Sequence, residues 1–256
     1  MTKVMTAHQP NFLPYLGFFD KMKAVDEMGT EPGVFVIRDD CQYVQRDFHH
    51  RNRIRTNTGD SWTWLYVPVD HEMMPINDVR IRYDKKINGR ELWTKYHLRM
   101  IRDNYKRTPF FDSFFPGFKE IYSDPGDNLA DFNKRLIRYL AECFEIETEL
   151  ISFYDLPGDI EDNDASETLA NISRAVKADI YLSGDGGKNY LDISPFGEDI
   201  KVEFQNYKHP IYPQRYPDFK PYMAAIDALF NIGYLPRSGE IVKGRIIREC
   251  EIHANI

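Results

Sequence analysis

Short apolar runs alternate with amphipathic stretches along much of this chain. The runs at residues 4–7 and 34–37 flank residues 14–27, where apolar positions recur with helical spacing. A strand–helix–strand unit of this kind builds parallel sheets, because the helix crosses over between the strands. Later runs predict strands at residues 150–153, 180–182 and 202–204. The pattern therefore predicts an α/β fold with a mainly parallel, Rossmann-like sheet flanked by helices.

The middle of the chain follows other patterns. Residues 61–69 and 79–83 alternate apolar and polar positions, which predicts antiparallel strands. In residues 86–145 the apolar positions recur with helical spacing, which predicts a possible helical subdomain. We expect further helices at residues 166–176, with Ser166 as N-cap, and at residues 221–232. The chain as a whole, residues 1–256, is expected to form a single α/β domain that contains this antiparallel and helical insertion.

Composition narrows the class of protein. Hydrophobic residues make up 42% and charged residues 29% of the 256 positions, as in ordinary globular proteins. The chain has 33 basic and 40 acidic residues, a net charge of −7, which argues against a dedicated nucleic-acid face. Cys41, Cys143 and Cys250 are too scattered for a disulfide framework. With no signal peptide and no apolar run of membrane-spanning length, the sequence predicts a cytoplasmic protein without a membrane partner.

The first polar cluster directly follows the first strand. In open α/β sheets, ligands bind beyond the carboxyl ends of the strands, which is where His8, Gln9 and Asn11 are expected. His8 is a candidate base or a hydrogen-bond donor that binds phosphate, because its ordinary pKa is about 6.5. Gln9 and Asn11 can both donate and accept hydrogen bonds. Alternatively, Asn11 only caps the next helix.

A second cluster follows the second strand. Asp39 and Asp40 are candidate catalytic bases, and Arg51 and Arg53 can clamp a carboxylate or phosphate through paired hydrogen bonds. The binding candidates in this segment are Gln42, Tyr43, Arg51, Asn52 and Arg53. These charges can also neutralise one another as a surface ion network. The segment offers too few ligands for zinc, so no metal site is predicted.

Two further segments carry candidate chemistry. A glycine-rich loop after the strand at residues 180–182 can cradle a phosphate, or it can be a tight turn that needs glycine for positive φ. Its binding candidates are Ser183, Gly184, Gly187, Lys188 and Tyr190. Residues 204–214 place His209 among aromatic residues and prolines, with Gln214 as a binding candidate. His209 is either a catalytic base or a structural histidine.

Four of these segments resemble the WbqC-like protein family. They are AHQPNFLPYLGFFDKM (7–22), VIRDDCQYVQRDFHHRNRI (36–54), YLSGDGGKNYLD (181–192) and HPIYPQ (209–214) followed by DALFNIG (227–233). The resemblance spans about residues 3–234. It implies a role linked to bacterial surface polysaccharides, as a candidate transferase of glycyl or another aminoacyl group onto an amino sugar. Many family members carry another residue where His8 stands, so the resemblance implies more about Gln9 than about His8.

These observations predict a small-molecule transferase that moves an acyl or aminoacyl group onto an amine. Its substrate would be a small molecule such as a sugar nucleotide or an activated amino acid. The alternatives are an adenylate-forming or nucleotidyl-transferring enzyme that uses ATP and Mg²⁺, and a non-catalytic sugar-nucleotide binder. No cofactor is required by the residues themselves. We expect one pocket to be lined by Gln9, Asp39, Arg51, Asn52, Ser183 and Gly184.

Overall fold

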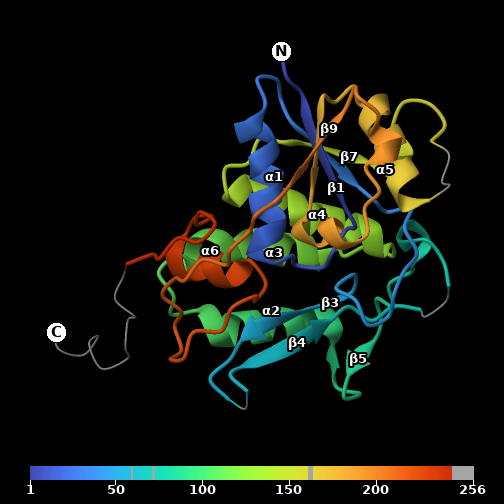
Figure 1. The fold of residues 1–256 in the computed structure, drawn as a ribbon. Helices are drawn as coiled ribbons and strands as arrows, with labels where there is room; N and C mark the ends of the chain where they lie inside the picture. Colours follow the sequence, from blue (N-terminus) through green and yellow to red (C-terminus); the bar gives the residue numbers. More distant parts are fainter. Residues whose placement is uncertain (59, 71–72, 161–163, 244–256) are drawn as a thin grey trace.

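A five-stranded, all-parallel sheet forms the centre of the molecule (Figure 1). The computed structural model describes residues 1–58, 60–70, 73–160 and 164–243. The strands, in their order across the sheet, are β7 (Glu149–Ser152), β2 (Val34–Ile37), β1 (Val4–His8), β8 (Ile180–Ser183) and β9 (Lys201–Phe204). The predicted α/β, Rossmann-like fold is therefore confirmed.

Helices cover both faces of this sheet. The helices of the described residues are α1 (Leu16–Met28), α2 (Trp93–Tyr105), α3 (Phe111–Ser123), α4 (Leu129–Cys143), α5 (Ala165–Ala175) and α6 (Ile226–Ile232). Strand β2 shows how the two faces are divided. Phe35 and Ile37 pack into the cluster that holds the apolar residues of α1 and α4, whereas Val34 and Val36 pack into the cluster that holds those of α5. Successive side chains of a strand point to opposite faces, so one apolar run serves two layers.

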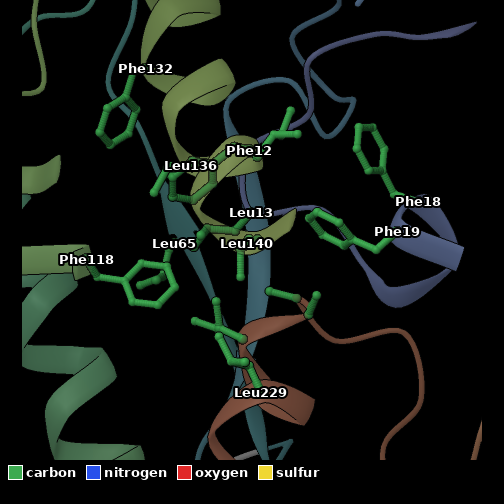
Figure 2. Packing of buried hydrophobic residues seen from close by; sticks show 14 of the residues in the cluster. Phe12, Leu13, Phe18, Phe19, Leu65, Phe118, Phe132, Leu136, Leu140 and Leu229 are labelled. Carbon is green, nitrogen blue, oxygen red and sulfur yellow. The ribbon is translucent and has the colours of Figure 1, made fainter. Parts of the chain in front are cut away.

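The larger cluster is rich in aromatic side chains (Figure 2). Phe12 is stacked on Phe132 with ring centroids 6.2 Å apart, and Trp93 meets Phe132 edge-on at 5.6 Å. The cluster joins α1 to α2, α3, α4 and α6, so the helices of residues 93–143 share one continuous core with the sheet. Truncating a buried phenylalanine such as Phe132 to alanine costs about 3–5 kcal/mol.

The antiparallel part of the fold is a hairpin of β3 (Arg51–Arg55) and β4 (Trp62–Tyr66), with a smaller pair of β5 (Lys86–Ile87) and β6 (Glu91–Leu92). The hairpin lies beside α2, at the opposite end of the molecule from the N-terminus (Figure 1). The prediction of a strand at residues 79–83 is wrong. Its residues form only isolated bridges, because Arg80 pairs with Asn128 whereas Ile81 pairs with Val69.

Two helix boundaries also differ from the prediction. Helix α5 is capped by Asp164, whose carboxylate accepts hydrogen bonds from the backbone amides of Ser166 (2.7 Å) and Glu167 (3.1 Å), so Ser166 is not the N-cap. Helix α6 begins at Ile226 rather than near residue 221, because Tyr222 has a left-handed backbone, with φ of 58°. Asn11 caps no helix, since α1 has Tyr15 at its N-cap position.

Two findings concern membrane-spanning helices and cysteines. In the described part of the chain, no helix is long and apolar enough to cross a membrane. Within the described residues, Cys41 and Cys143 form no disulfide, and Cys250 lies outside these residues.

Candidate active site

The order in which the chain adds strands to the sheet reverses between β1 and β8. From β1 the chain continues to β2 and then β7 on one side, and later returns to β8 and β9 on the other side. Connections that diverge in this way leave a crevice beyond the carboxyl ends of the strands. A cavity of about 510 Å³ lies there, and we call it the switch-point cleft. Its polar lining includes His8, Gln9, Tyr15, Lys21, Arg38, Ser183, Gly184, Gly187, Tyr190, Gln205, Tyr207 and Tyr222.

A second cavity, which we call the side chamber, adjoins the cleft. The two share His8, Gln9, Tyr15 and Tyr222 as lining residues. The side chamber adds Asn11, Pro14, Asp47, Phe48, Asn52 and Arg53. Two cavities with a common wall can hold two ligands whose reacting groups meet at that wall.

Lys21 lines the switch-point cleft, and the sequence patterns did not single it out. Its side chain leaves helix α1 and is only 3% exposed. Nζ donates a hydrogen bond to the carbonyl oxygen of Ala7 at the end of β1, at 2.9 Å. Within the described residues Lys21 forms no ion pair, so no carboxylate offsets its burial. Burial lowers the pKa of Lys21 to about 7, which makes its amine a proton acceptor near neutral pH.

His8 lies beside this amine. Its Nδ1 is 3.0 Å from the carbonyl oxygen of Gln9, so Nδ1–H donates and Nε2 keeps its lone pair. Burial is the main cause that lowers the pKa of His8 to about 3, and the nearby charge of Lys21 adds to it. The imidazole is therefore neutral at physiological pH and offers the cleft an acceptor.

The side-chain amide of Gln9 is oriented by His49. Nδ1 of His49 accepts a hydrogen bond from the backbone amide of Val44 at 3.2 Å, so its Nε2–H donates to Oε1 of Gln9 at 3.3 Å. Burial lowers the pKa of His49 and keeps this ring neutral, with one donor and one acceptor. With Oε1 engaged, the amide nitrogen of Gln9 is the group left to donate to ligands in the two cavities.

The glycine loop approaches Lys21. Gly184 has φ of −63°, and Gly186 and Gly187 likewise lack positive φ, so the tight-turn explanation based on φ is wrong. A Cβ on Gly184 would meet only Nζ of Lys21, at 3.9 Å, whereas a Cβ on Gly187 would overlap Oγ of Ser183. Gly184 thus keeps the space over the lysine open, and Gly187 allows close packing behind it.

His209 lies behind the cleft wall rather than in it. Its Nε2 accepts a hydrogen bond from the backbone amide of Tyr222 at 2.9 Å. Nδ1–H must then donate to Oη of Tyr207, at 2.7 Å, because burial lowers the pKa of His209 to about 4 and only one ring nitrogen carries hydrogen. The hydroxyl hydrogen of Tyr207 consequently points away from His209, and Tyr207 lines the cleft.

Neither aspartate of the second cluster lines the cleft. Asp39 is 0% exposed and accepts hydrogen bonds from Ser152 Oγ (2.7 Å) and Lys134 Nζ (3.1 Å). Asp40 forms a bidentate ion pair with Arg38, with N···O distances of 2.7–3.0 Å. The expectation that Asp39 shares a pocket with Gln9 is wrong, since Asp39 links β2 to β7 and α4 inside the protein. Arg38, which the sequence patterns also passed over, does line the cleft.

The arginine segment divides between cavities. Arg51 lines a third cavity on the β3–β4 hairpin and not the switch-point cleft, so that part of the pocket prediction is also wrong. Asn52 lines only the side chamber, and its amide nitrogen donates to the carbonyl oxygen of Leu13 at 2.6 Å. Arg53 lines the side chamber, and its guanidinium donates to the carbonyl oxygen of Tyr222 at 3.2 Å.

Three other binding candidates take part in contacts that stabilise the fold. Gln42 is exposed, and its backbone bridges to Pro75. Tyr43 is buried, with Oη 2.8 Å from Nδ1 of His50. Gln214 donates to the buried carboxylate of Asp227 at 2.7 Å. These contacts fix loops of the fold outside the cleft and the side chamber.

The remaining candidates differ in how they relate to the cavities, and Lys188 is not among the lining residues of any of the three. Lys188 forms an exposed ion pair with Asp185, at 2.7 Å. Tyr190 is 70% exposed and lines the cleft. Asn11 lines the side chamber, and its Oδ1 is buried without a hydrogen-bond partner. Among the described residues, no group of three or more His, Cys, Asp or Glu side chains is placed to hold a metal ion.

Comparison with known proteins identifies the family of this chain. The model of the WbqC-like protein family matches residues 9–237. The chain is also 32% identical over 232 residues to the uncharacterized protein Rv1507c of Mycobacterium tuberculosis. The aligned segment covers 88% of this chain and 92% of that protein. No solved structure matches the chain. The chain belongs to the WbqC-like protein family.

Proposed function

We propose that this WbqC-like protein is a small-molecule transferase that moves an acyl or aminoacyl group onto the amine of a second ligand, an amino-sugar nucleotide in the simplest case. The observation that carries the proposal is the shared wall of the two cavities. His8, Gln9 and Tyr15 border both the switch-point cleft and the side chamber. A transferase needs such an arrangement, because donor and acceptor must be held with their reacting atoms in contact.

Lys21 is suited to act as the base of this reaction. The acceptor nitrogen attacks the carbonyl carbon of the donor, the bond to the leaving group breaks, and the nitrogen gives up a proton. An acceptor for that proton works best with a pKa near the working pH, and the pKa of Lys21 is about 7. His8, with a pKa of about 3, holds a proton too weakly for this role.

Two donors of the cleft can stabilise the oxyanion that forms on the carbonyl oxygen. One is the amide nitrogen of Gln9, which His49 turns toward the cavities. The other is the hydroxyl group of Tyr207, which His209 orients from behind. Donors fixed before the reaction lower its barrier more than water does, because they need no reorganisation. The backbone at Gly184 is the candidate anion-binding group of the cleft, whereas the guanidinium of Arg38 is already paired with Asp40.

Thermal-shift screening followed by a transfer assay tests this function. A UDP-amino sugar is expected to raise the melting temperature, and an activated acyl or aminoacyl donor added with it is expected to give the N-acylated sugar. Stabilisation that needs both ATP and Mg²⁺, with formation of an adenylate, would instead support the adenylate-forming alternative. Sugar-nucleotide binding without turnover for any activated donor would leave a binding protein and contradict the transferase.

A further inference from the structure

The third cavity, on the β3–β4 hairpin, is lined by several basic residues and by no acidic one. We call it the hairpin cleft, and its volume is about 510 Å³. The side chains of Arg46, Arg51, Arg82 and Lys85 line it, and no aspartate or glutamate is among its lining residues. The chain as a whole has 40 acidic against 33 basic residues, so four cations around one cavity depart from the average of this molecule.

Most of these cations have no carboxylate partner. Within the described residues, Arg46, Arg51 and Lys85 take part in no ion pair. Arg82 has one loose contact, 3.8 Å from a carboxylate oxygen of Asp70, with both side chains more than half exposed. An exposed pair of this kind contributes little and is readily exchanged for a ligand.

Arg51 is held in place by neutral groups. Its guanidinium donates to the backbone carbonyl oxygens of Asp47, at 3.3 Å, and Arg46. It also lies over the ring of Trp64, 4.6 Å from the centroid. Carbonyl groups and an aromatic face fix the direction of the guanidinium without cancelling its charge.

The backbone around the cleft is tied together as well. Arg51 and Tyr66 are paired across the hairpin, and the amide of Val67 donates to the carbonyl oxygen of His50 at 2.7 Å. The amide of Arg82 donates to the carbonyl oxygen of Pro68 at 2.8 Å. The charged side chains thus project from segments whose relative positions are fixed before any ligand binds.

We propose that the hairpin cleft binds a small molecule that carries a diphosphate group. Two linked phosphates present negative charges along a length that several cations can contact, whereas a single carboxylate needs only one of them. Tyr66, which is 42% exposed, supplies an aromatic face on which a sugar or base attached to the diphosphate can stack. This site is separate from the switch-point cleft, with which it shares no lining residue.

Isothermal titration calorimetry with pyrophosphate and with UDP, at low ionic strength, tests the proposal. The double variant Arg82→Gln, Lys85→Gln is expected to lose roughly tenfold or more in affinity, since each charged hydrogen bond to a phosphate contributes about that factor. The matched control is Arg138→Gln, Lys119→Gln, which removes one arginine and one lysine from the exposed faces of α4 and α3. The control is expected to bind like the parent protein.

The same experiment separates this site from the active site. Pyrophosphate held in the switch-point cleft would bind the double variant as well as it binds the parent, and that result would overturn the proposal. Equal losses in the double variant and its control would also overturn it, because they would reflect net charge alone. Arg51→Lys, which keeps the charge but loses the planar fork, is expected to weaken binding while the melting temperature stays within a few degrees of the parent's.

Discussion

Lys21 and Arg51 show two opposite ways in which this molecule prepares a cation. Lys21 in the switch-point cleft is 3% exposed, with one backbone carbonyl as its hydrogen-bond partner. Arg51 in the hairpin cleft lies between backbone carbonyls and the face of Trp64. Burial without a carboxylate weakens the hold of an amine on its proton, whereas stacking leaves a guanidinium charged. We therefore interpret the first cation as a proton acceptor and the second as a fixed positive charge.

The largest effect is expected from removing the amine of the switch-point cleft. Lys21→Met should reduce the rate of transfer by roughly 10² to 10⁴, the usual contribution of a positioned base. Lys23→Met, two residues along the same helix and outside the cleft, is the matched control and should keep the parent rate. Steady-state kinetics on both variants checks this, and a Lys21→Met enzyme as fast as its control would remove Lys21 from the mechanism.

Stability should reveal the cost of burying this lysine. The pKa of Lys21 falls from 10.5 to about 7 on folding, so the unfolded chain binds more protons between these values and the folded parent gains stability as the pH rises through them. The free energy of unfolding of Lys21→Met should exceed that of the parent by a few kcal/mol at and below pH 7. This difference should disappear as the pH approaches about 10.5. Urea denaturation at several pH values measures the difference. A difference that does not depend on pH would mean that Lys21 keeps its ordinary pKa.

A smaller effect is expected at Tyr207, a hydroxyl donor that lines the same cleft as Lys21. Tyr207→Phe removes the hydroxyl group but keeps the ring, and should slow transfer roughly tenfold through the loss of one hydrogen bond to the oxyanion. His209→Phe removes the group that orients this hydroxyl, and should raise KM less than it lowers kcat. Should both variants change only the melting temperature, the pair would be structural.

The smallest effects are expected from two glycines of one loop, which should respond in opposite ways. Gly184→Ala places a methyl group in open space near Lys21, so it should keep or gain up to about 1 kcal/mol of stability while weakening ligand binding. Gly187→Ala overlaps Ser183, so it should lose about 1–3 kcal/mol through overpacking. Melting temperatures and sugar-nucleotide affinities measured together compare them. Normal binding by Gly184→Ala would exclude this loop from the site.

The three inner strands of the sheet, β1, β2 and β8, were predictable because each is a compact and largely buried run, whereas the edge strands β7 and β9 are partly exposed. Val34 to Ile37, for example, is an uninterrupted apolar run in the sequence and is fully buried between two helical layers. The segment at residues 79–83 has an equally regular alternation, but its neighbours along the fold are two different loops. A local pattern does not contain that information, because bridge partners are set by tertiary packing.

The site was predictable only where chemistry and chain position coincide. Gln9 directly follows β1 and Ser183 is the last residue of β8, so the topology alone brings them to one edge of the sheet. Asp39 also follows a strand, yet it points into the protein toward Ser152 and Lys134, which no spacing revealed. Lys21 was missed because a lysine on an amphipathic helix usually faces water. Its burial depends on how α1 crosses the end of β1.

The protonation of Lys21 is the most direct test of the account. Lysine amines methylated with carbon-13 formaldehyde can be titrated by NMR, and the Lys21 signal is identified by its absence in Lys21→Met. We expect this signal to titrate near pH 7 and to shift when a UDP-amino sugar binds. A Lys21 signal that titrates near 10.5, and that does not respond to the sugar nucleotide, would contradict the assignment of the switch-point cleft as the site of transfer.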